Sequence, residues 1–203
     1  MTQAWMERYA GAAEEVIRYS ALVYERGLVS AAGGNVSVRQ GDRIVITGSN
    51  VPLRAVTPEG LVLCGGQGEV LEAAPGLKPS KETRFHLAVY RARPRARCVI
   101  HAHPVYSTIW SMRDKPLPLY TKSAQLKLVQ VPVIPEGVPG SAQLADSVAQ
   151  AVEAAPEECT AFLMEAHGAL VLGETMESCF QQLELLEDTA KIAVFQELLA
   201  RER

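Results

Sequence analysis

The hydrophobic residues near the start of the chain recur every three or four positions. Over residues 1–26 this spacing predicts one amphipathic helix, which Gly27 ends. The same periodicity predicts three further helices, over residues 80–93, 141–152 and 175–199. Ser80 is expected to cap the first of these three, and Pro94 stops it. A helix is therefore expected at each end of the chain.

Short apolar runs lie between the predicted helices, and turn-forming residues bound them. The predicted strands cover residues 35–39, 42–47, 60–64, 96–102, 128–134 and the two halves of 160–173. A tight turn is expected at His167 and Gly168, and loops over 65–79 and 113–125. Several strands follow one another without an intervening helix. This order predicts an α/β domain over residues 1–203, with a largely antiparallel sheet covered by helices.

The composition of the 203-residue chain narrows the classes of function. A hydrophobic content of 48% is enough for the core of one domain. The net charge of -3 gives no general attraction to nucleic acid or to an anionic membrane, so an anionic ligand must be held by local donors. Glu7, Glu14 and Glu15 argue against a signal peptide or membrane span at the start, and a cytoplasmic location is expected.

The four cysteines are far apart and form no C-x-x-C pair. They are Cys64, Cys98, Cys159 and Cys179. Each lies in an apolar or helical context, which is typical of buried free thiols rather than of disulfides or zinc ligands.

Three of the four histidines lie at predicted strand ends. In "CVIHAHPVYS" the alternation of an extended chain places His101 and His103 on one face, which suits either two metal ligands or a hydrogen-bonded pair. His167 beside Gly168 is either a turn residue or a third ligand. Three neutral imidazoles would leave an open position on a divalent ion, as a catalytic metal requires. The spacing alone does not show that His167 joins the pair.

The stretch "KPSKETRFH" combines charged and hydroxyl side chains at a predicted helix start. Glu82 either stabilises the helix through its dipole or acts as an acid/base group. His86 lies on the same helix face, where a packed or hydrogen-bonded role is expected rather than metal ligation. Ser80, Lys81 and the backbone N–H groups would form an anion site, although a serine cap is also common in ordinary helices.

Two glycine-containing segments, "GGNVS" and "ITGS", supply further donors. Gly34 frees the backbone beside the amide of Asn35, and Thr47 and Gly48 offer hydroxyl and backbone donors at a strand end. Each segment alone also fits an ordinary hairpin turn.

The order of these motifs resembles the class II aldolase and adducin-head family, which includes fuculose-phosphate aldolase and ribulose-phosphate 4-epimerase. The motifs are "GGNVSVR", "ITGS", "KPSKETRFH", "VIHAHPVYSTIWS", "VPVIPEGVPGS" and "FLMEAHGALVLG". The likeness extends from Gly27 to about Phe195. It implies a three-layer α/β/α domain with a largely antiparallel central sheet, and a homotetramer with active sites between subunits.

The resemblance also implies roles for individual residues. The implied metal ligands are His101, His103 and His167. Glu82 falls on the acid/base position, where it can also touch the metal when no substrate is bound. The implied phosphate-binding positions are Gly34, Asn35, Thr47, Gly48, Ser80 and Lys81. The imidazoles suit Zn²⁺, while Mn²⁺, Co²⁺ or Fe²⁺ remain open.

Two departures from the aldolase pattern concern substrate and proton transfer. The aldolases have "PSSE" where this chain has Lys81, and a sugar-acid phosphate decarboxylase branch is similar to this chain in having "PSKE". The aldolases also place a tyrosine in a C-terminal tail, whereas this sequence ends at Arg203 directly after its last predicted helix. Tyr106 and Tyr120 are the nearest substitutes, and both suit packing roles.

The expected function is that of a metal-dependent lyase. The first hypothesis is an aldolase that converts a phosphorylated ketose to dihydroxyacetone phosphate and an aldehyde. The second is a 3-oxo sugar-acid phosphate decarboxylase. An epimerase is less favoured because those enzymes have aspartate at the position of Glu82. A thioribulose-phosphate dehydratase is less favoured because its glycine motif is less similar to "SAAGGNVSV" than that of the aldolases. A non-catalytic sugar-phosphate-binding or scaffold protein is the alternative outside enzymes.

Overall fold

The computed structural model describes residues 4–113 and 115–200. Its seven α-helices are α1 (Ala4–Arg8), α2 (Ala10–Glu25), α3 (Thr83–Ala92), α4 (Val105–Ser111), α5 (Lys122–Lys127), α6 (Ala142–Ala154) and α7 (Met176–Ala200). Two 3₁₀ turns lie at Leu53–Ala55 and Pro58–Gly60. The predicted helices over residues 80–93, 141–152 and 175–199 are confirmed in kind, with shifted boundaries.

The eight strands form one continuous sheet. They are β1 (Asn35–Gln40), β2 (Arg43–Thr47), β3 (Leu61–Gly65), β4 (Val70–Ala73), β5 (Cys98–Ala102), β6 (Val133–Ile134), β7 (Ala161–Met164) and β8 (Gly168–Gly173). Their order across the sheet is β4-β3-β2-β1-β5-β8-β7-β6. Neighbours pair antiparallel except β6 and β7, which are parallel, so the predicted largely antiparallel sheet is confirmed.

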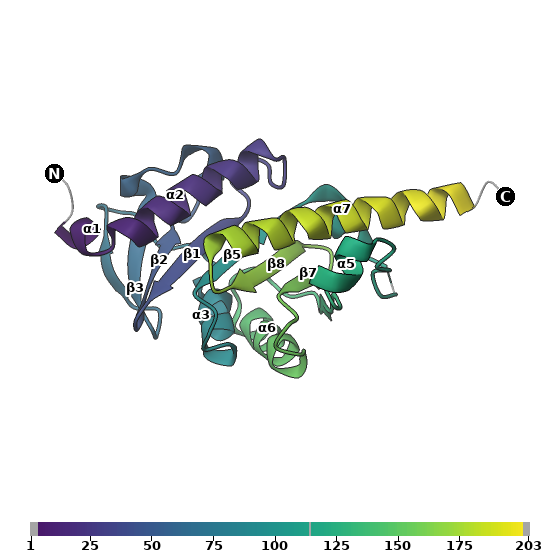
Figure 1. The fold of residues 1–203 in the computed structure, drawn as a ribbon. Coiled ribbons are helices and arrows are strands. Elements are labelled where there is room, and N and C mark those ends of the chain that lie inside the picture. Colours follow the sequence, from purple (N-terminus) through teal and green to yellow (C-terminus); the bar gives the residue numbers. More distant parts are fainter. Residues whose placement is uncertain (1–3, 114, 201–203) are drawn as a thin grey trace.

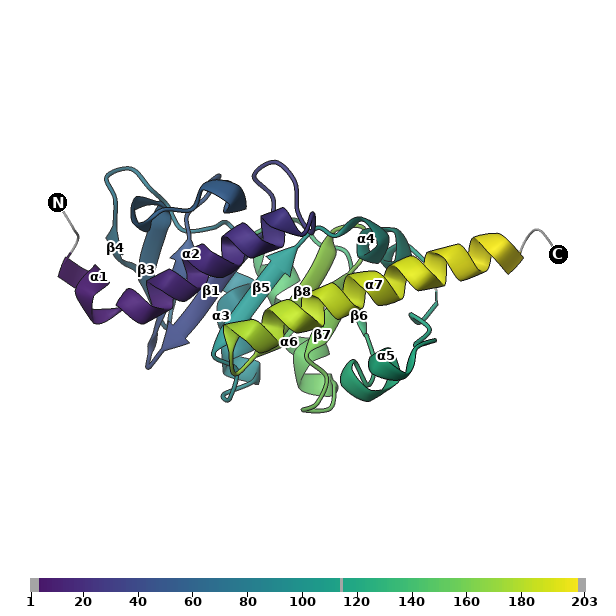
Figure 2. The same ribbon diagram turned by 45° about the horizontal axis from the view of Figure 1, so that its top comes forward.

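Helices cover both faces of the sheet, as Figures 1 and 2 show. The long helix α7 and helix α2 lie on one face, and α3 and α6 on the other. Alternation along β1 explains why both faces are occupied: Val36 and Val38 belong to the core under α2, while Ser37 between them contacts α3. The predicted three-layer arrangement is confirmed.

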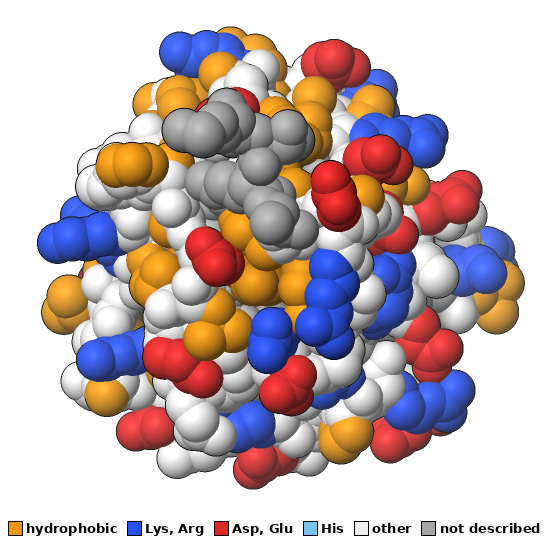
Figure 3. All heavy atoms as spheres, turned by 90° about the vertical axis from the view of Figure 1, so that its left-hand side faces the viewer, with side chains coloured by type: hydrophobic (Ala, Val, Ile, Leu, Met, Phe, Trp, Pro, Cys, Tyr) orange, Lys and Arg blue, Asp and Glu red, His pale blue; other side chains and the backbone are white. Residues whose placement is uncertain are grey.

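On the face at the α1 end of the molecule (Figure 3), the described residues form no large patch of only positive or only negative side chains. Figure 3 shows positive, negative and hydrophobic side chains interspersed there. This agrees with the small net charge. Within the described ranges, no helix combines the length and apolar character needed to cross a membrane.

The opening segment differs from the prediction of one helix. A break at Tyr9, where φ is -114° and ψ is 20°, separates α1 from α2. Residues 1–3, where the prediction starts, lie outside the described residues. The predicted end is confirmed: α2 stops at Glu25, and Gly27 adopts a φ of +69° that favours glycine.

Two predicted loops contain regular structure. β4 lies within 65–79 and was missed because it is an edge strand with mostly exposed side chains. α5 lies mostly within 113–125, and its signal is Thr121, whose hydroxyl accepts a hydrogen bond from the N–H of Ala124. Asp114 in the same predicted loop lies outside the described residues.

The predicted strand over 128–134 is mostly wrong. Val129 has a φ of +61°, which interrupts an extended chain, and only Val133–Ile134 pairs with β7. All four cysteines, in contrast, are buried and free, as predicted. Burial raises the pKa of the Cys64 thiol to about 11, so it is not ionised at neutral pH.

Candidate active site

The candidate site lies where β1 and β5 run side by side. The antiparallel register places Asn35 directly opposite His101, on the sheet face that packs against α3. His103 follows two residues later, directly after the end of β5, and Pro104 is the N-cap residue of α4. The two histidines therefore share one face, as the alternation predicts.

His167 reaches the same place from the turn between β7 and β8. Its neighbour Ala166 has a φ of +50°, and the N–H of Ala166 donates to the hydroxyl of Ser111 at 3.1 Å. A Cβ atom at Gly168 would lie 2.3 Å from the carbonyl oxygen of Ala102, so glycine is needed for this close approach. The turn thereby holds His167 beside the end of β5.

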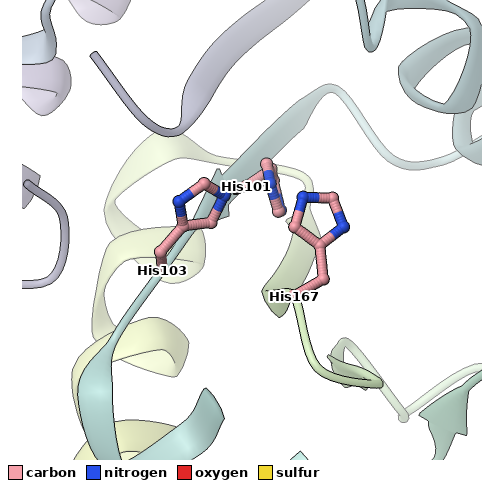
Figure 4. A group of neighbouring side chains, drawn as sticks. All are labelled: His101, His103 and His167. Atoms are coloured by element: carbon pink, nitrogen blue, oxygen red, sulfur yellow. Dashed lines mark hydrogen bonds between the residues drawn. The ribbon is translucent and has the colours of Figure 1, made fainter. Parts of the chain in front are cut away.

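The three imidazole rings face one another (Figure 4). One nitrogen from each of His101, His103 and His167 lies within 4.8 Å of the others. The Nε2 atoms of His101 and His103 are 2.9 Å apart. Because Nδ1 of His101 donates to the carbonyl oxygen of Ala169 at 2.9 Å, its Nε2 carries the lone pair that faces the cluster.

Glu82 completes the cluster from the start of α3. It occupies the N-cap position but makes no side-chain cap hydrogen bond. Its Oε2 atom lies 3.3 Å from Nε2 of His101, and its Oε1 atom 3.3 Å from Nε2 of His167. Oε2 accepts a hydrogen bond from Nδ2 of Asn35 at 2.8 Å, whereas buried Oε1 has no hydrogen-bond partner in the described chain. The carboxylate thus serves the site rather than the helix.

The predicted cap of this helix is corrected. Ser80 lies three residues before the first helical residue, Thr83, and forms a turn with it. The Ser80 hydroxyl accepts from the N–H of Glu82 at 3.3 Å. The prediction placed the helix start too early because a local serine-containing turn precedes the N-cap.

The electrostatic environment favours neutral imidazoles. Burial lowers the pKa of His101 well below its usual value, and the other two imidazoles add to this effect. Burial and the proximity of His167 lower the pKa of His103 to about 4. Burial raises the pKa of Glu82, against the opposing effects of Asn35 and His167. The neutral imidazoles of buried His101 and half-buried His103, together with His167 and an unpartnered carboxylate oxygen, match the donor set of a divalent metal ion.

The predicted anion-binding segments are also adjacent. Gly48 forms a bridge with Pro79, and the N–H of Ser80 donates to the carbonyl oxygen of Thr47 at 3.1 Å. Gly34 lies against β5, where an added Cβ would be 2.9 Å from the carbonyl oxygen of His101. Phosphate binding by these residues stays a prediction.

The side chains of two predicted site residues, Asn35 and Lys81, differ in their hydrogen bonding. Each end of the Asn35 amide has one partner: Nδ2 donates to Glu82, and Oδ1 lies 2.5 Å from Nε2 of His86. The Lys81 side chain is exposed and makes no hydrogen bond or ion pair with the described residues. Its ammonium group is therefore available to an anionic ligand.

The two candidate tyrosines lie in different environments. The Tyr106 ring packs at 5.9 Å from that of Phe195, and the Lys191 ammonium lies 5.5 Å over it. Tyr120 is 55% exposed. Neither hydroxyl makes a hydrogen bond to the described part of the chain, and a role for either in proton transfer stays a prediction.

Sequence reasoning missed the residues that support the cluster. His86 was expected to be packed or hydrogen-bonded, which is confirmed, since its Nδ1 lies 2.7 Å from the hydroxyl of Ser37. Ser37 and Tyr90 were not identified. A signal existed: Ser37 lies two residues after Asn35 on a strand, and Tyr90 four residues after His86 on a helix, so each shares a face with its neighbour.

The chain is similar to known proteins along most of its length. Residues 14–194 match the family model described as Class II Aldolase and Adducin N-terminal domain. The chain is 30% identical over 179 residues to an L-fuculose phosphate aldolase of Methanococcus vannielii, covering 88% of this chain and 93% of the relative. It is 32% identical over 185 residues to a 3-oxo-tetronate 4-phosphate decarboxylase of Escherichia coli, covering 88% and 84%.

A solved structure extends the likeness to three dimensions. The crystal structure of an L-fuculose-1-phosphate aldolase from Thermus thermophilus has a TM-score of 0.80 and 29% identity with this chain. The match covers 94% of this chain and 96% of that one. The similarity in fold therefore extends over nearly the whole of both chains.

Proposed function

Because the chain belongs to the class II aldolase and adducin N-terminal domain family, we propose that it is a metal-dependent lyase that cleaves a phosphorylated ketose to dihydroxyacetone phosphate and an aldehyde. The same site would condense these products in the reverse direction. One observation carries the proposal: the three imidazoles converge within 4.8 Å, and the Glu82 carboxylate lies 3.3 Å from two of them. A binding or scaffold protein does not require this acid beside a metal-type cluster.

The proposed metal site consists of His101, His103 and His167, with Glu82 as a further ligand in the absence of substrate. A divalent ion held there would supply Lewis-acid stabilisation of negative charge on the substrate oxygens. The neutral state of His101 and His103 supports this assignment, because a protonated ring nitrogen has no lone pair for a metal. Zn²⁺ suits the three nitrogen donors best, and Mn²⁺, Co²⁺ and Fe²⁺ are the other candidates.

Glu82 is the proposed acid/base residue. In cleavage, the carbon–carbon bond breaks and its electron pair stays with the fragment that becomes dihydroxyacetone phosphate. That fragment then accepts a proton from the Glu82 carboxyl. The hydroxyl that becomes the aldehyde loses its proton to a base at the other end of the substrate. In condensation, Glu82 removes the same carbon-bound proton. Burial raises the pKa of Glu82 and so favours the protonated form that cleavage requires.

The proposed phosphate site is formed by Gly34, Asn35, Thr47, Gly48, Ser80 and Lys81. The adjacency of the segments around Gly48 and Ser80 supports this assignment. Phosphate held there would orient the reacting carbons toward Glu82 through binding energy remote from them.

The second candidate function is decarboxylation of a 3-oxo sugar-acid phosphate. Loss of CO₂ from a β-keto acid leaves an electron pair on the same kind of carbon, so one site can serve both reactions. The exposed, unpaired ammonium of Lys81 next to Glu82 favours this alternative, as does the decarboxylase relative. Lys81→Ser tests it: if Lys81 binds a carboxylate, kcat/KM should fall about tenfold or more for sugar-acid phosphates and much less for neutral ketose phosphates.

Product analysis tests the proposed function directly. Metal-loaded protein is incubated with ketose 1-phosphates and 3-oxo sugar-acid phosphates, and dihydroxyacetone phosphate and CO₂ are measured separately. Chelator-sensitive release of dihydroxyacetone phosphate supports the aldolase, and release of CO₂ alone supports the decarboxylase. The absence of both products with every substrate, with metal bound, would favour the binding or scaffold alternative.

We further propose a homotetramer with active sites between subunits, and a cytoplasmic location. Exposed apolar side chains on α4, at its C-cap and on the far end of α7 support self-association: Val105, Ile109, Met112, Phe195 and Leu198. Figure 2 shows α7 extending beyond the sheet next to α4. Light scattering of the purified protein tests the oligomeric state.

A further inference from the structure

A buried chain of polar side chains leads away from Glu82 between α3 and β1. Glu82, His86 and Tyr90 follow one another at four-residue intervals along α3, and Asn35 and Ser37 are alternate residues of β1. Four residues of helix rise about 6 Å, and two residues of strand about 6.6 Å. The two elements can therefore present their polar side chains to each other in register.

Each member of this chain touches the next. Nδ2 of Asn35 donates to Glu82 at 2.8 Å, and Oδ1 of Asn35 lies 2.5 Å from Nε2 of His86. Nδ1 of His86 lies 2.7 Å from the Ser37 hydroxyl, which in turn lies 2.7 Å from the Tyr90 hydroxyl. All five side chains are buried, and Ser37 and His86 are fully inaccessible to solvent.

The chemistry of the groups fixes the direction of these hydrogen bonds. Nδ2 of Asn35 donates to Glu82, so the amide oxygen of Asn35, which can only accept, faces His86. Nε2 of His86 must then carry the proton, which leaves Nδ1 as an acceptor. The Ser37 hydroxyl therefore donates to Nδ1, and the one proton of the Tyr90 hydroxyl is shared between the hydroxyl and the carbonyl oxygen of Ser37. Each orientation depends on the one before it.

The arrangement has a structural reason to stay fixed. A buried polar atom without a partner costs free energy, so a flipped Asn35 amide would leave unfavourable contacts with both Glu82 and His86. The Asn35 amide that restrains Glu82 can therefore be held in one orientation by groups that do not themselves touch Glu82. The restrained carboxylate keeps its second oxygen, Oε1, free beside His167.

We propose that His86, Ser37 and Tyr90 are positioning residues that hold the Asn35 amide in the orientation that restrains Glu82. The inference rests on the proposed function of Glu82, but the hydrogen-bond order itself does not. The Tyr90 hydroxyl contacts Ser37 at two atoms, Oγ at 2.7 Å and the carbonyl oxygen at 3.1 Å, so its shared proton holds the Ser37 side chain in place. One test therefore addresses the direction of the hydrogen bonds, and the others address their effect on catalysis.

The first test is the protonation pattern of His86 in the metal-free protein. The chain has four histidines, so ¹⁵N–¹H correlation spectra of histidine-labelled protein can resolve each ring. We expect His86 to carry its proton on Nε2, and Ser37→Ala to weaken this preference. A wild-type His86 protonated on Nδ1 would overturn the proposal. This measurement requires no catalytic activity, so its outcome is independent of the proposed function.

The second test separates positioning from packing. Ser37→Ala should lower kcat about tenfold, which is the size of effect seen when a residue that supports a metal site is removed. KM should change less than about twofold, and the amount of bound metal should stay constant. Ser20→Ala is the matched control, because Ser20 is fully buried and its hydroxyl has no partner in the described chain. An equal loss of kcat in both variants would overturn the positioning role.

A double-mutant cycle identifies the route through Asn35. In an Asn35→Ala background, Ser37→Ala should cause no further loss of kcat, because the amide it orients is gone. His86→Gln, whose amide can still donate to Asn35, should keep more activity than His86→Leu. Additive losses in the cycle, or equal activity of the two His86 variants, would contradict the proposal.

Discussion

Two glutamates in this molecule illustrate how the surroundings of a carboxylate decide its role. Glu187 of α7 accepts from the N–H of Tyr106 at 2.9 Å and from the N–H and hydroxyl of Ser107 at 2.8 Å. Both of its oxygens are occupied at the start of α4. Glu82 has one oxygen held by Asn35, while the other, although buried, has no hydrogen-bond partner in the described chain and faces His167.

The difference lies in what each carboxylate leaves unsatisfied. Glu187 stabilises the first turn of the helix that follows His103 and Pro104, and it has no remaining buried acceptor. Glu82 keeps an acceptor at a cost in desolvation, and this cost is offset when a proton or a metal ion binds. A saturated carboxylate thus suits structure, and an unsaturated one beside imidazoles suits chemistry.

The largest expected effect is loss of the metal when one imidazole of the cluster beside Glu82 is removed. His101→Ala or His103→Ala should lower bound metal from about one ion per chain to near background, because two nitrogen donors hold a divalent ion poorly. Metal analysis after gel filtration measures this. His86→Gln is the matched control and should retain metal, since its ring contacts Asn35 and Ser37 instead. Unchanged stoichiometry in the alanine variants would refute the ligand set.

The comparison of the two glutamates predicts the next effect. Glu82→Gln should reduce kcat about 10²–10⁴-fold, because the amide cannot transfer a proton. Metal content and thermal stability should stay close to wild type. Glu187→Gln, the matched control, should keep kcat within about threefold once any loss of folded protein is corrected for. Full activity of the Glu82 variant would exclude it as the acid/base residue.

The free energy of unfolding should respond in the opposite order to kcat: a change at Glu187 should lower it more than a change at Glu82. Glu187→Ala removes the acceptor for two backbone N–H groups and one hydroxyl, and should lower the free energy of unfolding by about 1–3 kcal/mol. Urea denaturation of the metal-free protein, with Glu82→Gln measured beside it, provides the comparison. A larger loss of stability in the Glu82 variant would reverse the roles assigned to the two residues.

The sequence predicted the parts of the site that depend on short-range periodicity. Alternation placed His101 and His103 on one face, and motif order supplied the resemblance that implied His167 as their neighbour. Spacing alone left His167 open, because the turn that carries it is fixed by contacts from distant segments, such as the hydroxyl of Ser111 with Ala166. Sequence separation conceals contacts of this kind.

The errors in the fold prediction have similar causes. β4 is an exposed edge strand whose identity depends on its pairing with β3, and the positive φ of Val129 interrupts the largely apolar run over 128–134. In both places tertiary contacts override local preference. The support of α4 by Glu187 was equally hidden, because it joins residues 80 positions apart or more.

The buried and half-buried histidines also predict a pH dependence of stability in the metal-free protein. Burial lowers the pKa of His86 to about 3, and that of His103 to about 4, whereas unfolded histidine titrates near 6.5. Below about pH 6.5 the unfolded chain therefore binds more protons, and stability should fall as the pH decreases toward 4. The raised pKa of Glu82 acts in the opposite direction and reduces the slope.

Urea denaturation between pH 7.5 and about 4 measures this slope, and His86→Gln provides the comparison because it removes one of the contributing imidazoles. The variant should lose less stability on acidification than the wild type. Because protons compete with metal for the remaining imidazoles, metal-loaded protein should lose stability more steeply than metal-free protein over the same range. Equal slopes for the wild type and His86→Gln would contradict a buried neutral His86, and with it the direction assigned to the hydrogen bonds beneath Glu82.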